Sequence, residues 1–147
     1  MPTMQEVLAD TTQRKNLIED CARLIDDEVQ NKGGLGGMAI KAGYKVVKGL
    51  KPGFIHEATD SLIDAFAEQL QPIATEAKEK GKPVAAFFDS ERSRVAEALL
   101  SITDKRAERS SHKVVKGTYQ KLRPTAKKHV EDAVPGVGRL VEKHTAG

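Results

Sequence analysis

The sequence predicts an all-α fold, a single-domain bundle of about six to eight helices. Ala, Leu, Glu, Lys and Arg, which favour helix, are abundant, and no stretch alternates β-branched with polar residues as a half-buried strand would. Apolar residues make up 39% of the chain and aromatic residues only 4%, so the core is expected to be aliphatic. A chain of 147 residues suits one domain, 1–147.

A faint internal repeat predicts how these helices are arranged. When the sequence is shifted by 75 residues, segment 36–66 lies without a gap on segment 111–141. Lys41 and Tyr44 then recur as Lys116 and Tyr119, and most other matches pair apolar with apolar or basic with basic residues. We therefore expect two similar three-helix units, about 12–71 and 90–144, related by internal pseudo-two-fold symmetry and joined by a helical linker, 72–89.

A second alignment competes with this one. The pentapeptide Lys-Val-Val-Lys-Gly occurs at 45–49 and again at 113–117, an offset of 68. That offset places Ile40 on Glu108 and Ile63 on Glu131, so apolar positions meet charged ones. We therefore prefer the offset of 75.

The first two helices have clear starts. Thr3 and Glu6 have the spacing of a capping box, which opens a short helix, and Asp10 follows it as a cap for the next. The second helix has apolar residues at helical spacing up to Val29. The glycines at 33 and 34 are expected to close it in the left-handed conformation.

Prolines and glycines divide the remaining chain. A basic helix over about 37–50 ends at 51–53, and an amphipathic helix follows over about 54–71, with a further helical segment from Pro72. The apolar run 84–88 is expected to fill the core. The second unit then has helices over about 90–108 and 111–123, a break at Pro124, and a last helix from 125 with a kink at Pro135.

Charge is unevenly distributed along this basic protein. Residues 1–104 hold 13 Lys and Arg against 17 Asp and Glu, a balance of −4, whereas residues 105–147 hold 11 against 4, a balance of +7. The only cysteine, Cys21, cannot form an intrachain disulfide, and the N-terminus does not resemble a signal peptide. We expect a soluble cytoplasmic protein, and membrane association is not expected because the last helix lacks Trp and Phe.

Sequence motifs for catalysis, cofactors or metals are absent, so an enzyme is not expected. The glycines at 34 and 36 match part of a dinucleotide fingerprint, but a predicted helix precedes them where that motif needs a strand. No two of the four histidines are three or four residues apart, which argues against a metal site. Cys21 lies on an apolar stripe and is expected to be a buried, inert thiol.

The repeated basic helices supply the candidate site residues. Each tyrosine has a basic residue three positions before it and another four after it, and a tyrosine there can pack its ring inward with its hydroxyl at the rim. Phosphates are bound by Lys and Arg, and an aromatic ring can stack on a base. The expected arrangement is that both tyrosines pack in the core and the basic side chains are solvated. The alternative is a pair of contact sites for an anion or nucleic acid, formed by Lys41, Tyr44, Lys48, Lys116, Tyr119 and Arg123.

Several segments also resemble a known family. They are Gly34-Leu35-Gly36-Gly37 with the lysine-rich helix behind it, segment 99–107, and the ending Leu140-Val-Glu-Lys-His144. Together they are similar to a family of small bacterial proteins, a domain of unknown function. The resemblance implies one unit of this length and carries over no catalytic or binding residue.

Three function classes remain in order of preference. The first is a non-catalytic helical protein that binds a macromolecular partner or itself. The second is a nucleic-acid-associated protein that uses the repeated basic helices. The third is a small-ligand binder or enzyme with a pocket between the two halves. No cofactor is expected.

Overall fold

The computed structural model describes residues 2–146, apart from the side chains of residues 34–36. Over this range the chain forms seven helices and no strand, which confirms the predicted all-α bundle. The helices are α1 (Met4–Ala9), α2 (Thr11–Gln30), α3 (Gly34–Lys48), α4 (Phe54–Glu79), α5 (Val84–Ser90), α6 (Arg92–Arg109) and α7 (Lys113–Thr145).

The predicted caps of the first two helices are confirmed. The Thr3 hydroxyl accepts a bond from the Glu6 backbone N–H at 3.1 Å, and the Glu6 carboxylate accepts one from the Thr3 N–H at 3.2 Å. Asp10 accepts a bond from the Gln13 N–H at 2.9 Å at the start of α2. These bonds satisfy backbone donors that a helix start leaves free.

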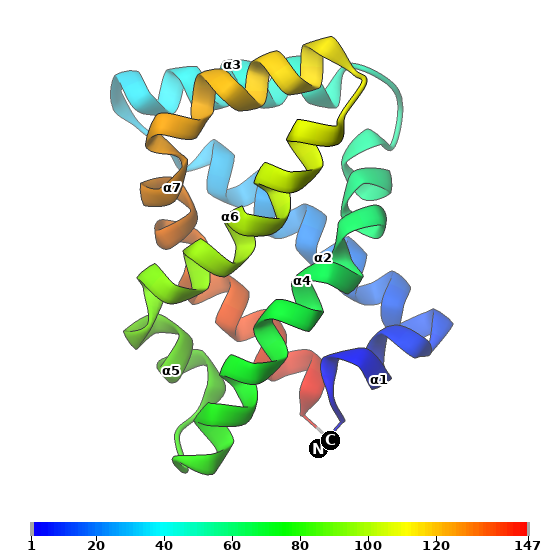
Figure 1. Cartoon of the computed structure of the whole chain (residues 1–147), viewed down its shortest axis with the longest axis vertical. Coiled ribbons are helices and arrows are strands. Elements are labelled where there is room, and N and C mark those ends of the chain that lie inside the picture. The colour runs from blue at the N-terminus through cyan, green and yellow to red at the C-terminus, as the bar shows by residue number, and fades with distance from the viewer. Residues whose placement is uncertain (1, 147) are drawn as a thin grey trace.

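Three predictions about helix ends are wrong. The chain does not break at Pro124, because α7 continues through it, and α4 likewise runs through Pro72. A proline inside a helix removes one hydrogen bond and bends the helix, and Figure 1 shows α7 changing direction sharply after its first turns. Gly33 is not left-handed: its φ is −121°, and it serves as the extended residue before α3.

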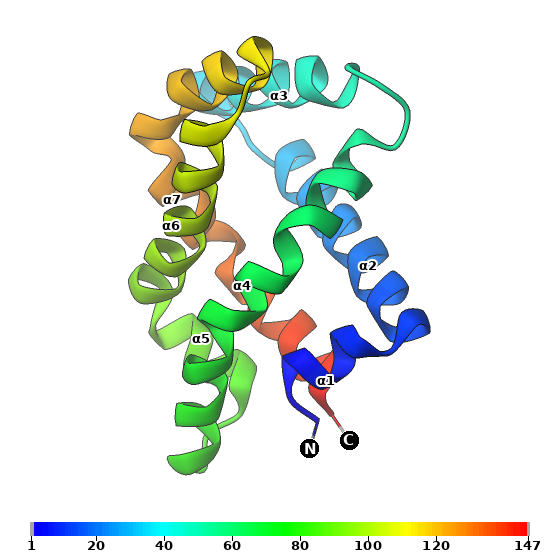
Figure 2. The same ribbon diagram turned by 45° about the vertical axis from the view of Figure 1, so that its right-hand side comes forward.

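Helices α2, α4, α6 and α7 form the long walls of the molecule (Figure 2). At one end, α3 and the first turns of α7 lie side by side, and at the other end α1 and α5 lie near the two termini (Figure 1). Gly43 permits the close approach of α3 to α7, since a Cβ there would lie 3.0 Å from Leu122 and 3.1 Å from Thr118. Gly43 and Thr118 correspond in the 75-residue alignment; the pseudo-two-fold symmetry itself stays a prediction.

The end near the termini holds a dense apolar core, here called the packed base. The predicted core position of the apolar run 84–88 is confirmed, because Val84, Phe87 and Phe88 are buried. Sixteen buried side chains form the packed base: Met4, Val7, Leu8, Leu17, Ile63, Ala67, Leu70, Ile73, Ala74, Ala77, Val84, Phe87, Phe88, Val95, Val134 and Val141. Burial at this density is the main source of stability in the fold.

Candidate ligand-binding site

A cavity of about 430 Å³ lies among the long helices, and we call it the central cavity. Side chains of α2, α4, α6 and α7 form its walls, and Ile40 of α3 contributes at one side. Met4, Leu17 and Leu70 belong both to its lining and to the packed base. Of its 26 lining residues, 21 are aliphatic, Phe, Met or Cys. The cavity therefore lies between the two predicted halves of the chain.

The apolar stripes predicted from sequence produce the cavity walls. Leu24 of α2, Leu62 and Phe66 of α4, and Val137 of α7 all line it, as helical spacing indicates. Each is only half-buried, unlike the fully enclosed side chains of the packed base. The inner faces of these helices thus face one another without filling the space between them.

One close contact lies between two of the walls. A Cβ on Gly136 of α7 would lie 2.4 Å from the Leu24 Cδ1 of α2, closer than real atoms approach. That atom is the flexible end of a side chain, so a larger residue at position 136 would first displace the Leu24 side chain within the cavity wall.

Most polar groups in the cavity wall already have hydrogen-bond partners. The Thr59 hydroxyl donates to the Ile55 carbonyl at 2.7 Å, and the Thr103 hydroxyl lies 2.8 Å from the Tyr119 hydroxyl. His129 differs from these, because its Nδ1 is buried and has no hydrogen-bond partner among residues 2–146. A buried polar atom without a partner costs about 1–3 kcal/mol, so His129 is an unusual group in this wall.

Lys32 lies in the same part of the cavity wall as His129. Its side chain is 13% exposed, and its Nζ pairs with Asp132 at 3.2 Å. Burial lowers the pKa of His129 below its usual value, and the positive charge of Lys32 lowers it further. The imidazole of His129 is therefore neutral at neutral pH.

Cys21 is half-buried; it lines the cavity and also packs against the packed base. Burial raises the pKa of its thiol to about 11, and the charge of neighbouring Asp20 acts in the same direction. A thiol with so high a pKa is a poor nucleophile at neutral pH.

The predicted contact residues of the first unit form what we call the first aspartate cluster: Asp26, Tyr44 and Lys48. The Tyr44 hydroxyl donates to Asp26 Oδ1 at 3.3 Å, and Lys48 Nζ lies 3.4 Å from the same oxygen. The Lys48 ammonium also lies 5.5 Å from the centre of the Tyr44 ring. Lys41 is exposed, and among the described residues no carboxylate lies within ion-pairing distance of it.

The second unit has a matching arrangement, the second aspartate cluster: Asp104, Tyr119 and Arg123. Arg123 forms two bonds to the Asp104 carboxylate, at 2.8 and 3.1 Å, and Tyr119 donates to the same carboxylate. Burial and this bond raise the pKa of Tyr119 to about 12, and Arg123 keeps the pKa of Asp104 below its usual range. Lys116 makes no ion pair within residues 2–146.

The structure thus joins four of the six predicted residues in pairs and adds two aspartates that sequence reasoning missed. Asp26 precedes Tyr44 by 18 residues, and Asp104 precedes Tyr119 by 15. The two separations differ by three residues, because the chain between Asp26 of α2 and Tyr44 of α3 is longer than that between Asp104 of α6 and Tyr119 of α7. The aspartates therefore do not align at the offset of 75. Allowing a gap between the long and the basic helix would have found them. Both tyrosine hydroxyls are engaged, and of the predicted cations Lys41 and Lys116 form no ion pair with the side chains that the structure describes.

Residues 2–146 contain no group of three or more His, Cys, Asp or Glu side chains placed to hold a metal ion. Within the same range, no helix has the length and apolar character needed to cross a bilayer. The sequence model described as "Family of unknown function (DUF6918)" matches residues 4–145. The chain belongs to the DUF6918 family. No curated protein and no solved structure matches this chain.

Proposed function

We propose that this DUF6918 protein binds an apolar small molecule in the central cavity. The observation that carries the proposal is the cavity itself: about 430 Å³, lined almost entirely by apolar side chains. Pockets for small molecules usually measure about 300–1,000 Å³ and combine apolar walls with a few polar groups. This geometry favours the third function class predicted from sequence, as a non-catalytic binder.

The apolar wall is partly open to solvent, since Ile25 in the cavity lining is 37% exposed. Covering apolar surface is worth about 25 cal/mol per Å². An apolar ligand would gain free energy by covering this wall.

Titration with N-phenyl-1-naphthylamine, an uncharged probe that fluoresces in apolar surroundings, tests the proposal. We expect saturable binding with one probe per chain. A ligand present at 100 times its Kd adds about 2.7 kcal/mol of stability, so Tm is expected to rise by about 5–10 °C.

A cavity-filling variant supplies the control. Ala58→Leu with Ala133→Leu places extra methyl groups in the cavity wall and is expected to reduce probe binding at least tenfold. Ala86→Leu, at an exposed position of α5, is expected to bind the probe like the unmodified protein. If the folded protein binds no probe, or the filled variant binds it equally well, the proposal is wrong and a macromolecular partner becomes the leading alternative.

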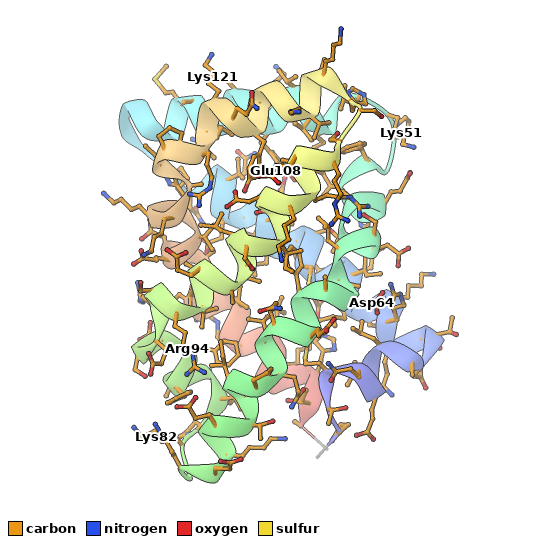
Figure 3. The ribbon with its side chains drawn as sticks, in the orientation of Figure 1. Lys51, Asp64, Lys82, Arg94, Glu108 and Lys121 are labelled. Carbon is orange, nitrogen blue, oxygen red and sulfur yellow. The ribbon has the colours of Figure 1, made fainter. Side chains whose placement is uncertain are left out.

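A second candidate function rests on the basic end, which we define as α3 with residues 113–123. This surface carries seven Lys and Arg residues and no acidic residue. Figure 3 places Lys51 and Lys121 at this end of the molecule. Such a surface suits an anionic partner such as a nucleic acid, although Lys48 and Arg123 are partly neutralised by their aspartates.

Fluorescence anisotropy of labelled single- and double-stranded oligonucleotides, titrated at two salt concentrations, tests this candidate. We expect binding that weakens steeply with salt and is lost in the Lys41→Glu, Lys116→Glu double variant, because phosphate contacts release counterions. No binding at low salt would rule it out and leave these lysines as solvated side chains.

A further inference from the structure

The strongest clue to what fills the central cavity is the polar group that the fold leaves without a partner. His129 lines the cavity and its Nδ1 is buried, yet no protein group bonds to it. Proteins rarely leave a buried polar atom unbonded unless water or a ligand meets it. His129 therefore marks a point on the wall where a ligand's polar group would be held.

Lys32 adds a charge beside this point. Its ammonium can donate three hydrogen bonds, and in the structure it has a single partner, the half-exposed Asp132. The wall thus offers unused donors next to an imidazole that can donate from Nδ1.

The charges around His129 favour an anion. Lys32 and Lys128 both lower the pKa of His129, and only Asp132 opposes them. Glu28 also lines the cavity, one turn before Lys32, and it is the one acidic side chain in the lining. A negative head group is therefore expected beside His129 and Lys32, away from Glu28.

We propose that the ligand of the central cavity is a single-chain amphiphile whose carboxylate is bound by Lys32 and His129. Lys32 Nζ–H and His129 Nδ1–H donate to the two carboxylate oxygens, and the alkyl chain lies along Leu62, Phe66 and Val137. This inference rests on the proposed function, since it names the ligand class for the same cavity.

The volume sets the length of the chain. A water molecule occupies about 30 Å³ in the liquid. If each non-hydrogen atom of the ligand takes the same volume, 430 Å³ holds about 14 such atoms. Dodecanoate has about that size by the same measure. Longer chains would have to extend past the exposed edge at Ile25.

Competition against bound N-phenyl-1-naphthylamine tests the proposal with three ligands of equal chain length: dodecanoate, 1-dodecanol and dodecyltrimethylammonium. We expect dodecanoate to displace the probe at a concentration about tenfold below that of the alcohol, because bonds to charged groups are worth about that factor or more. The cation is expected to compete least well.

Two variants test the residues. Lys32→Met and His129→Leu keep the side-chain bulk and remove the donors, and each is expected to abolish the tenfold preference for dodecanoate over 1-dodecanol. A cooperative thermal melt shows that each variant is folded. Lys121→Met is the matched control, because Lys121 is an exposed lysine on α7, the helix that carries His129. It is expected to change the affinity for neither dodecanoate nor the probe.

The outcomes separate this inference from the proposed function. Equal affinity for all three ligands, or a preference for the cation, would overturn the carboxylate site while leaving the apolar cavity a binding site. Unchanged dodecanoate affinity in both donor variants would overturn it as well. Failure of the probe itself to bind would instead overturn the proposed function.

Discussion

The packed base and the walls of the central cavity are built from the same helices and the same residue types, yet they differ in how their apolar faces meet. In the packed base, α5 places Phe87 and Phe88 between α4 and α7, and every side chain of the cluster is buried. No helix occupies the corresponding position between the cavity walls, so Leu62 and Phe66 remain half-buried. The short helices α1 and α5 together supply six of the sixteen side chains of the packed base, three each.

This difference indicates a division of roles along the bundle. The packed base supplies most of the apolar burial and hence the stability of the fold. The walls above it retain half-buried apolar surface, and ion pairs such as that of Arg14 in α2 with Asp60 and Asp64 in α4 link them. A region of lower stability beside a stable core is where ligand sites are commonly found.

The largest expected effect compares two phenylalanines. Phe88→Ala in the packed base is expected to cost about 3–5 kcal/mol, because Phe88 is fully buried and its removal creates a new cavity. Phe66→Ala in the cavity wall is expected to cost about 1–2 kcal/mol, because it only enlarges a space that already exists. Urea denaturation of both variants measures the difference, and equal losses would show that the cavity is filled by the protein in solution.

The packed base can be predicted from the sequence more fully than the central cavity. Local spacing predicts the cap at Thr3, the inner face of α4 and the burial of Val84, Phe87 and Phe88, although Ala86 in the same run is exposed. Periodicity says which face of a helix points inward, but it does not say whether opposite faces touch, because that depends on helix crossing angles and on what lies between them. The cavity, the bend at Pro124 and the two aspartate clusters all depend on such long-range geometry.

A smaller effect is expected at the second aspartate cluster, which links α6 to α7 through Asp104 and Arg123. Asp104→Asn removes one charge from a two-bond pair with Arg123 and is expected to cost about 1 kcal/mol at pH 7, since the pair is partly exposed to solvent. Glu57→Gln removes the charge of a carboxylate that is 66% exposed and pairs with Lys51; it serves as the comparison and is expected to cost less.

The same variant has a pH signature. Arg123 holds the pKa of Asp104 below 3.8, so the folded state favours the charged carboxylate. Its contribution to stability is present above pH 3.8 and is lost as the pH falls through the lower, folded-state pKa. Thermal melts from pH 7 to pH 2 are therefore expected to show a smaller acid loss in Asp104→Asn than in the unmodified protein. An identical loss in both would show that the cluster does not form in solution.

The last comparison measures the solvent accessibility of the two regions, rather than their stability, through the reactivity of a thiol in each. Cys21 lines the central cavity, and burial raises its pKa to about 11, so at pH 8 roughly 0.1% of it is thiolate. Its reaction with a small thiol reagent is expected to be slow, to accelerate about tenfold per pH unit up to about pH 11, and to slow again when dodecanoate fills the cavity.

A thiol placed in the packed base by Val7→Cys, in a Cys21→Ala background, is expected to react only through global unfolding, since Val7 has no exposed surface. Reaction of Cys21 in the folded unmodified protein, without reaction of the introduced thiol in the folded Val7→Cys variant, would support an accessible cavity above a closed core. Equal protection of both thiols, with no effect of dodecanoate, would mean that the two regions are packed alike.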